Sequence, residues 1–404
     1  MCAGDSAVSD DRLMAALMTP GGRGAVATVQ FLGDCRVIDE AGSVLFRAAN
    51  GKPLVEQAVG RIVFGGWGTC TPEDVVVCRV DARQLEIHCH GGDSASRRVL
   101  DDLERVGCSI VGWEELSRHT LGPFAAECLE ALSSATTQRT ADFLLRQHSG
   151  LLRAAIENIE PMASGDGRQP DQFSDDERAG ATQRFDELLC WANFGLHLTQ
   201  PYRVVLAGRP NVGKSSLSNA LVGYSRSIVH GTPGTTRDVV TVETALDGWP
   251  IRFSDTAGIR DAGEPIESAG IERARDELQQ ADCRVVLVDV SEPPHADDRT
   301  LIDGWPDAIR VAHKCDLDDV WAGSLPAGCL HVSSVTGEGV DDLAGEIVSR
   351  LVPKVPAKRV AVPITARQVS TLEKARRALE ADDVSGFRRS IGECLFCEES
   401  FEDA

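Results

Sequence analysis

The sequence lacks any long hydrophobic run, and no basic stretch followed by an apolar one stands near its amino terminus. A membrane-spanning helix needs about 18 or more apolar residues in a row, and a secretory leader needs that basic-then-apolar order. Both absences argue against membrane insertion and secretion, so we expect a cytoplasmic protein without a membrane partner. The 13 cysteines are scattered, without the regular spacing of a disulfide scaffold, which also fits a reducing compartment.

Positive charge is scarce as well. The chain has 41 Lys and Arg against 62 Asp and Glu, and its formal net charge is −21. This balance disfavours a protein that coats nucleic acid non-specifically, because such a protein needs a basic face. It leaves room for a structured RNA held at one local patch. We interpret the short basic stretches 97–98, 354–359 and 388–389 as solvated surface charge.

The hydrophobic pattern changes along the chain, and no internal repeat is present. With 404 residues, 42% of them hydrophobic, the chain is long enough for two or three globular domains. We predict a multidomain α/β and α+β protein. Its expected parts are a small α+β domain (1–112), a first helical part (113–199), an inserted domain with a mainly parallel sheet covered by helices (200–353), and a second, truncated helical part (354–404).

Within these parts the alternation of apolar and polar residues predicts strands, and helical spacing of apolar residues predicts helices. The predicted strands are 25–29, 61–64 and 74–78 in the first domain and 203–207, 240–245, 251–255, 284–289, 309–313 and 330–333 in the inserted one. Clear helices are expected at 94–106 and 365–381. The polar stretch 164–180, rich in Gly, Pro, Asp and Gln, is predicted to be a surface loop or a disordered excursion.

The segment Gly208–Ser215 follows an apolar strand and precedes a helical stretch. Its pattern, Gly, four residues, then Gly-Lys-Ser, is the phosphate-binding P-loop. The glycines let backbone N–H groups point at phosphates, and the helix amino terminus adds its positive dipole end. Lys214 is expected to reach the β- and γ-phosphates, and Ser215 to bind Mg²⁺. The predicted nucleotide-binding residues of this segment are Asn211, Val212, Gly213, Lys214, Ser215 and Ser216.

Two later segments fall where a nucleotide switch needs them. Gly234–Asp238 supplies Thr235 and Thr236, and the hydroxyl of Thr236 can bind Mg²⁺ and sense the γ-phosphate. Asp255-Thr256-Ala257-Gly258 ends a strand. Its Asp255 is expected to hold Mg²⁺ through water, and the N–H of Gly258 to bond the γ-phosphate. Such contacts order both loops in the triphosphate state.

Choice of base rests on His313-Lys314-Cys315-Asp316, which follows an apolar strand. The carboxylate of Asp316 can accept hydrogen bonds from the guanine N1 and N2 donors, which adenine does not offer in the same way. Lys314 is expected to lie over the base. Ser333 and Ser334 are expected to close the site with a backbone N–H. These residues favour GTP over ATP.

The chain resembles the MnmE (TrmE) tRNA-modification GTPases. The likeness rests on the P-loop, on Gly234–Asp238, on the run from Asp255 through Ala274, and on Thr336–Val340. Two amino-terminal signatures add to it: Thr19–Gly24 and Glu86–Gly92. The resemblance implies a cytoplasmic homodimer that acts on the wobble uridine of tRNA with a flavin-dependent partner. It also implies 5-formyl-tetrahydrofolate binding, with Arg23 and the Gly91-Gly92 turn as candidate elements.

The resemblance carries a mechanism too. Ile259 stands where Ras-like enzymes have the glutamine that positions water, and isoleucine cannot do so. In the family a glutamate slightly downstream acts instead, and it falls on Glu267; the other reading is a solvated carboxylate at a helix start. The expected catalytic set is Glu267, Lys214 and Gly258. The family uses K⁺ in place of an arginine finger, with Asn211 as the matching ligand and carbonyls of 230–234 beside it.

Three features depart from the family pattern, the first being the segment Trp113–His119, which lacks the Pro-Gly of the family's folate-enclosing segment. His313 stands where the family has Asn, which predicts weaker nucleotide binding. Phe396-Cys397 is followed by Glu398-Glu399 in place of Ile-Gly-Lys, so a reactive thiol is disfavoured. Cys394 and Cys397 also form one Cys-x-x-Cys pair, weak evidence for zinc or redox chemistry. Two hypotheses therefore stay open: a tRNA-modifying GTPase, or a regulatory or assembly GTPase of the same ancestry that has lost the modification chemistry.

Overall fold

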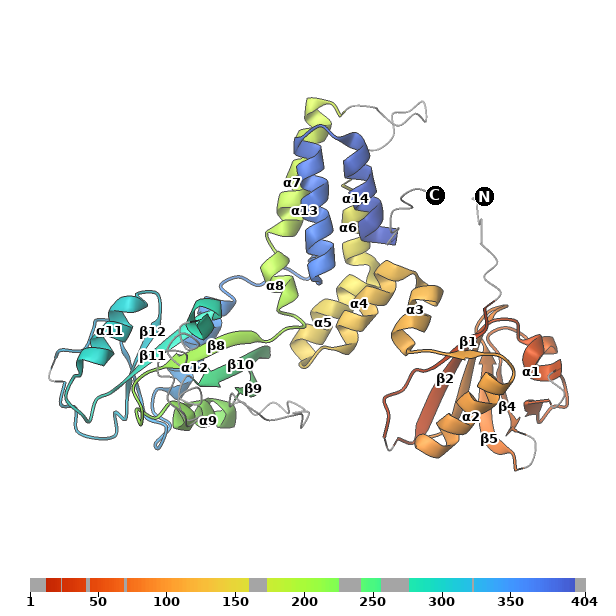
Figure 1. Ribbon diagram of the computed structural model, residues 1–404, viewed down its shortest axis with the longest axis horizontal. Helices are drawn as coiled ribbons and strands as arrows, with labels where there is room; N and C mark the ends of the chain where they lie inside the picture. The colour runs from red at the N-terminus through yellow and green to blue at the C-terminus, as the bar shows by residue number, and fades with distance from the viewer. Residues whose placement is uncertain are drawn as a thin grey trace, which may run out of the picture. The chain divides into compact units, whose positions relative to one another are not determined.

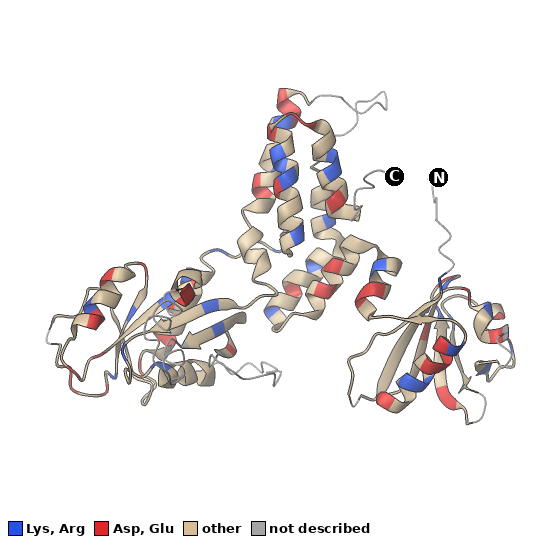
Figure 2. Cartoon of the chain, viewed as in Figure 1, with Lys and Arg blue, Asp and Glu red and all other residues tan. Residues whose placement is uncertain are grey.

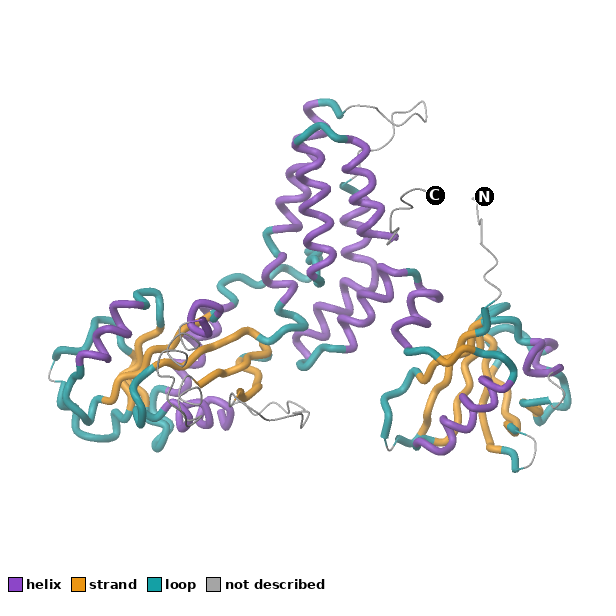
Figure 3. Tube along the Cα trace, in the orientation of Figure 1, coloured by secondary structure: helices purple, strands orange, loops and turns teal. Residues whose placement is uncertain are grey.

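The computed structural model describes residues 12–22, 24–40, 44–68, 71–159, 173–224, 241–255, 276–321 and 323–396. The chain divides into two compact units, Met1–Glu127 and Cys128–Ala404 (Figure 1). Both contain a sheet, and the second also contains a helical part that holds no strand (Figure 3). The expected multidomain α/β and α+β architecture is confirmed.

The first unit is built around a seven-stranded sheet with strand order β3-β4-β5-β6-β2-β1-β7. All neighbours are antiparallel except β1 and β7, which run parallel. The strands are β1 Met14–Leu17, β2 Val26–Leu32, β3 Phe46–Ala48, β4 Ile62–Trp67, β5 Glu73–Arg79, β6 Gln84–His90 and β7 Ser109–Ile110. The helices are α1 Arg36–Glu40, a 3₁₀ turn Leu54–Glu56, α2 Asp93–Arg105 and α3 Trp113–Leu121.

One face of this sheet is buried and the other meets solvent. Along β4, Val63 is 5% exposed, whereas its neighbours Ile62 and Phe64 are 72% and 55% exposed. Helix α2 covers the buried face with Val99 and Leu103, which are fully buried in the same core cluster. This period-two burial is what an antiparallel sheet with one packed face requires.

The helical part of the second unit comes from two stretches far apart in sequence. Helix α13 packs against α14 and α7, and α14 packs against α6 (Figure 1). Helix α4 (Pro123–Ser133) continues across the division into this unit. The other elements are α5 Gln138–Arg146, a π-helical turn Gln147–Leu151, α6 Leu152–Glu157, α7 Asp175–Leu189, α8 Ala192–Leu196, α13 Ala366–Glu380 and α14 Val384–Phe396.

One prediction for this part was wrong, and one helix inside the expected second helical part was not predicted. Residues 175–180 are helical rather than part of a loop, because Ser174 caps α7. The Ser174 hydroxyl accepts from the Glu177 backbone N–H, and the Glu177 carboxylate accepts from the Ser174 backbone N–H, a capping box. Helix α14 was not expected at all. Its Val384, Phe387 and Ile391 are buried at helical spacing against the bundle, which offsets the cost of its two glycines.

The other half of the second unit is a six-stranded sheet with strand order β13-β12-β11-β8-β10-β9. Every neighbouring pair is parallel except β10 and β9. The strands are β8 Tyr202–Ala207, β9 Thr241–Leu246, β10 Trp249–Asp255, β11 Cys283–Asp289, β12 Ile309–His313 and β13 Leu330–Val332. The helices are α9 Lys214–Tyr224, α11 Ala296–Gly304 and α12 Val340–Leu351. The mainly parallel sheet covered by helices is confirmed.

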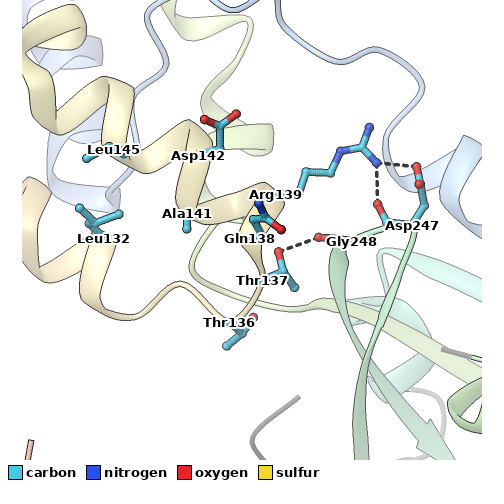
Figure 4. A pocket seen from close by; sticks show the side chains of 10 residues that line it. All are labelled: Leu132, Thr136, Thr137, Gln138, Arg139, Ala141, Asp142, Leu145, Asp247 and Gly248. Atoms are coloured by element: carbon cyan, nitrogen blue, oxygen red, sulfur yellow. Dashed lines mark hydrogen bonds and ion pairs between the residues drawn. The ribbon is translucent and has the colours of Figure 1, made fainter. Parts of the chain in front are cut away.

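The β9–β10 hairpin joins this sheet to helix α5. Its turn is Asp247-Gly248, with φ of 47° and 76°, the left-handed pair that a two-residue hairpin turn needs. The Thr137 hydroxyl donates to the Gly248 carbonyl at 2.7 Å, and Arg139 bonds both the carbonyl and the carboxylate of Asp247 at 2.5 Å (Figure 4). We call this set of contacts the hairpin clamp.

Candidate functional site

The P-loop connects β8 to α9 as the pattern predicted. Gly213 has φ of 102°, and a Cβ atom there would lie 2.4 Å from the ring of His313. A Cβ atom on Gly208 would lie 2.7 Å from the Leu287 carbonyl oxygen. Asn211 is exposed and also left-handed, with φ of 63°. Space therefore requires glycine at both positions, and at Gly213 the left-handed backbone requires it as well.

Lys214 opens helix α9 and turns back over its own loop. Its ammonium group donates to the carbonyl oxygens of Gly208 and Arg209, both at 3.0 Å, and the residue is 4% exposed. Ser215 and Ser216 follow in the first turn of the helix and are exposed. An amino-terminal turn with its backbone N–H groups unused by the helix is suited to bind an anion. The loop thus presents one buried cation and a helix amino terminus at the same place.

Parallel pairing brings further strand ends to this edge. In the register of β10 and β8, Asp255 is opposite Leu206, next to the P-loop. In the register of β11 and β12, Asp289 is opposite His313. Carboxyl ends of neighbouring parallel strands form the crevice in which open α/β sheets bind ligands. The predicted Mg²⁺ residues Ser215 and Asp255 therefore belong to adjoining segments of one edge, which fits an oxygen-ligated Mg²⁺.

His313 links the base side of the edge to the phosphate side. It is 2% exposed, its Nδ1 lies 2.7 Å from the Val212 carbonyl oxygen, and its Nε2 lies 2.7 Å from the Ser334 hydroxyl. These partners assign a neutral ring that donates from Nδ1 to the carbonyl and accepts from the hydroxyl at Nε2. Burial lowers the pKa of His313, and only part of that effect is offset by the bond to Val212. His313 thus ties the segment 313–316 to the P-loop through Val212 and to the turn after β13 through Ser334.

Lys314 is held by a carboxylate that sequence reasoning had missed. Its ammonium group forms an ion pair with Asp289 at the end of β11, and Asp289 also accepts from the Ser291 hydroxyl at 2.6 Å. Burial alone would raise the pKa of Asp289, but the hydrogen bonds from Lys314 and Ser291 outweigh it and lower the pKa. The signal was present in the sequence, because an Asp that ends a buried parallel strand lies on the ligand-binding edge.

Asp316 and the serine pair complete this side. Asp316 is exposed, so its carboxylate is accessible to a base. Ser333 is fully buried, its hydroxyl accepts from the N–H groups of Val335 and Thr336, and its own N–H donates to Glu338. Ser333 therefore shapes the turn, and within the described residues the N–H of Ser334 has no protein acceptor.

Several predicted site residues lie outside the described residues. These are Arg23, Thr235, Thr236, Gly258, Glu267, Cys397 and the carbonyl-bearing segment 230–234. Cys394 is described and fully buried. Gly91 and Gly92 line a hollow of about 480 Å³ at the start of α2, where a Cβ on Gly91 would lie 1.9 Å from the Gly24 carbonyl oxygen. No cluster of three or more potential metal ligands occurs among the residues described.

Comparison with known proteins agrees with this geometry. Residues 203–313 match the family model described as "50S ribosome-binding GTPase". The chain also resembles the G domain of the FeoB iron transporter of T. maritima, at 28% identity over 37% of this chain and 99% of that one, with a TM-score of 0.28. The family match, together with the P-loop, identifies the protein as a P-loop GTPase, an enzyme that binds and hydrolyses GTP.

Relatives along almost the whole chain are more specific. The "tRNA modification GTPase MnmE" of Symbiobacterium thermophilum is 32% identical over 91% of this chain and 88% of its own. The protein of the same name from Geobacillus thermodenitrificans is 31% identical over 92% and 89%. The chain belongs to the MnmE family of tRNA modification GTPases. In the described part of the chain, no helix is long and apolar enough to cross a membrane.

Proposed function

We propose that this GTPase serves the modification of wobble uridine in tRNA and hydrolyses GTP with the help of a bound cation. The observation that carries the GTPase part is the His313 link. It fixes the base-reading segment to the P-loop through Val212 and to the turn after β13 through Ser334, both at 2.7 Å. A nucleotide needs its base and its phosphates held at one fixed separation. A buried side chain that is hydrogen-bonded at both ring nitrogens fixes that separation.

The phosphate side acts through Lys214. Its ammonium group exchanges the carbonyls of Gly208 and Arg209 for the β- and γ-phosphate oxygens, while the N–H groups of Asn211, Val212, Gly213 and Ser216 surround the phosphates. On the base side Asp316 accepts from guanine N1 and N2. Lys314, held in place by Asp289, lies over the base, and the Ser334 N–H bonds the guanine oxygen.

Hydrolysis depends on residues at the strand ends. Ser215 and Thr236 would hold Mg²⁺ directly and Asp255 would hold it through water, and the metal would supply positive charge against the β- and γ-phosphates. The N–H of Gly258 and the hydroxyl of Thr235 bind the γ-phosphate side of the nucleotide. Glu267 orients the attacking water in place of the missing glutamine.

Asn211 is the proposed K⁺ ligand. Its exposed side chain stands at the tip of the P-loop in a left-handed conformation that Asn tolerates well. K⁺ in this position would offset the negative charge that develops between the β- and γ-phosphates. The proposal includes a homodimer, because the family binds K⁺ where two GTPase domains meet.

The hydrolysis is tested by turnover at equal ionic strength in KCl and NaCl. We expect faster GTP hydrolysis in KCl, and equal rates would remove the role of K⁺. In the variant Glu267→Ala we expect GTP to bind with wild-type affinity while turnover is lost; wild-type turnover would remove the catalytic role of Glu267. The conservative variant Glu267→Gln tests whether the negative charge is needed.

The biological role is tested separately. We expect wobble uridines to lose their modification when the gene is deleted, as read by mass spectrometry of digested tRNA. Unchanged modification would favour the second candidate, a regulatory or assembly GTPase, which the Glu398-Glu399 sequence after Cys397 supports. Titration calorimetry with 5-formyl-tetrahydrofolate tests the folate site, and an Arg23→Ala variant is expected to abolish the heat of binding. A flavin-dependent partner protein is expected on the modification pathway.

A further inference from the structure

Three cations line one hollow in the helical part of the second unit. Arg184 extends from α7, and Lys354 and Arg359 come from the segment that connects α12 to α13. The hollow has a volume of about 630 Å³, within the range of about 300–1,000 Å³ that is usual for small-ligand sites. Its lining also includes Trp191, Glu187 and Cys190. We call it the basic hollow.

The connecting segment that carries two of the cations is held in place. Gln147 is 1% exposed, its side-chain oxygen accepts from the Val362 N–H at 3.1 Å, and its amide group donates to the Val360 carbonyl at 3.4 Å. A Cβ atom on Gly195 would lie 1.9 Å from the Pro363 carbonyl oxygen, so the segment packs directly on α8. The cations are therefore presented by fixed backbone, and the basic hollow is preformed.

Among the described residues, these cations differ from their neighbours in having no anionic partner. Arg178 pairs with Asp382 at 2.8 Å and Arg376 with Asp186 at 2.9 Å on the same bundle. In the described part of the chain, neither Arg184 nor Lys354 nor Arg359 forms an ion pair. Both signs of charge are spread along these helices (Figure 2), yet the basic hollow has three cations against the single carboxylate of Glu187. All three cations are exposed, so water can hydrate them as the sequence suggested, but in a chain of net charge −21 such a local excess of positive charge would attract an external anion.

The lining between the cations is apolar and partly aromatic. Leu188 and Ala361 are buried at its floor, and Trp191 is half-buried, with the Lys354 ammonium group 5.4 Å from its ring centroid. A flat apolar surface beside several cations suits a ligand with a planar body and an anionic group. An unpaired nucleotide combines both in one unit, since its base stacks on apolar or aromatic surface and its phosphates attract Lys and Arg.

We propose that the basic hollow binds an unpaired segment of the RNA substrate, with the base against Trp191 and the flanking phosphates at Arg184, Lys354 and Arg359. This inference rests on the proposed tRNA role, and it assigns to the bundle a contact separate from the nucleotide site. An acidic peptide would match the cations but would leave the apolar floor without a planar partner, which makes RNA the favoured occupant.

The test uses the full chain and a fluorescein-labelled tRNA transcript in an anisotropy titration. In the variant Arg184→Gln/Lys354→Gln/Arg359→Gln we expect binding to weaken about 10-fold or more at about 0.15 M salt, with the slope of log K against log salt reduced by about 2, as three lost phosphate contacts require. The matched control, Lys374→Gln/Arg377→Gln/Arg389→Gln, removes the same charge from exposed positions of the same bundle. We expect it to keep both affinity and slope close to wild type.

Three outcomes overturn the inference. Wild-type affinity in the first variant would overturn this inference but leave the proposed tRNA role intact. Failure of the wild-type chain to bind tRNA would overturn both. Equal weakening of tRNA binding in both variants would show that the loss of affinity comes from the change in net charge and not from the basic hollow. GTP turnover in both variants checks that they are folded, because none of the six residues belongs to the nucleotide site.

Cys190 supplies an independent readout from inside the hollow. It is exposed, so iodoacetamide should alkylate it, and the extent is measured by mass spectrometry of its peptide. We expect tRNA to slow this alkylation several-fold in the wild type and in the control variant, but not in the first variant. Protection by polyglutamate without protection by tRNA would contradict the assignment and favour an acidic protein partner.

Discussion

The two ends of the six-stranded sheet are stabilised by different kinds of contact. At the carboxyl ends of β8, β11 and β12 the buried groups are polar or charged: Lys214, Asp289 and His313 are 4%, 8% and 2% exposed. At the opposite end, next to the hairpin turn, Trp249 is 2% exposed and packs against Phe194 and Phe143, with ring centroids 5.4 and 6.1 Å away. One end is arranged for a ligand and the other for stability.

Burial of polar groups is costly unless each one is paired, and every buried polar group named here is paired. The nucleotide end therefore contributes little net stability, while the aromatic end contributes through apolar area. Strand β10 connects the two, since it begins at Trp249 beside the clamp and ends at Asp255 beside the P-loop. Substitutions at the two ends should separate cleanly into losses of stability and losses of binding.

The largest effect is expected at the aromatic end. Trp249→Ala removes a buried indole that contacts two other rings, so we expect the free energy of unfolding to fall by about 3–5 kcal/mol in urea titrations followed by circular dichroism. Trp249→Phe, which keeps an aromatic ring, serves as the control and should lose clearly less. A loss below about 1 kcal/mol for the Ala variant would contradict the difference between the ends.

The largest effect at the nucleotide end is on binding. Lys214→Ala removes a buried ammonium group that would bond two phosphates, so we expect about 100-fold weaker binding of a fluorescent GTP analogue. The same titration on Trp249→Phe should give wild-type affinity. If Lys214→Ala kept affinity within about 3-fold, the phosphate role of this residue would be excluded.

His313 should make stability depend on pH. Because burial lowers its folded pKa below the unfolded value of about 6.5, its contribution is complete above pH 6.5 and is lost as the pH falls through the folded pKa. We expect the wild type to lose up to about 1.4 kcal/mol per pH unit in that range relative to His313→Asn. His197, whose pKa burial also lowers, is present in both proteins and cancels in the difference. Identical pH profiles would show that His313 is not held neutral.

The smallest effect is expected from the ion pair of the hairpin clamp. The side chains of Arg139 and Asp247 are 38% and 68% exposed, and exposed pairs contribute about 0–1 kcal/mol. We expect the coupling between Arg139 and Asp247 to be no more than that, although Arg139→Ala alone costs more, because it also removes the bond to the Asp247 carbonyl and the guanidinium that lies 4.5 Å from the Trp249 ring centroid. A double-mutant cycle with Asp247→Asn, which tolerates the left-handed turn, measures the coupling; a value above about 2 kcal/mol would mean that the clamp, not the rings, holds the hairpin.

The sequence predicted the mainly parallel sheet well because its strands have strong local signals, whereas in the first unit it predicted β2, β4 and β5 and missed β1, β3, β6 and β7. The parallel strands that end at the P-loop and at His313 are mostly apolar, each interrupted by one arginine, and the structure confirms them within one or two residues. Helix α14 was missed because Gly386 and Gly392 weaken its local propensity, and its helicity comes from burial of Phe387 and Ile391.

The candidate site was predictable where motif spacing carries the chemistry, as in Gly208–Ser215. It was less predictable where a residue acts through a partner distant in sequence. Nothing local to Asp289 identifies Lys314, 25 positions later, as its partner. The bond from His313 to Val212 likewise depends on the left-handed Gly213, which leaves room for the ring. Weaker GTP binding through His313 stays a prediction.

The central claim, a guanine-selecting GTPase site, is tested most directly by exchange of the base-reading carboxylate. Xanthine has a carbonyl oxygen where guanine has the N2 amino group, so an amide at position 316 should donate where the carboxylate accepted. Turnover of GTP and xanthosine triphosphate is measured for the wild type and for Asp316→Asn. We predict that the wild type hydrolyses GTP about 100-fold more efficiently and that the variant reverses this preference. Unchanged preference for GTP in Asp316→Asn would contradict the account.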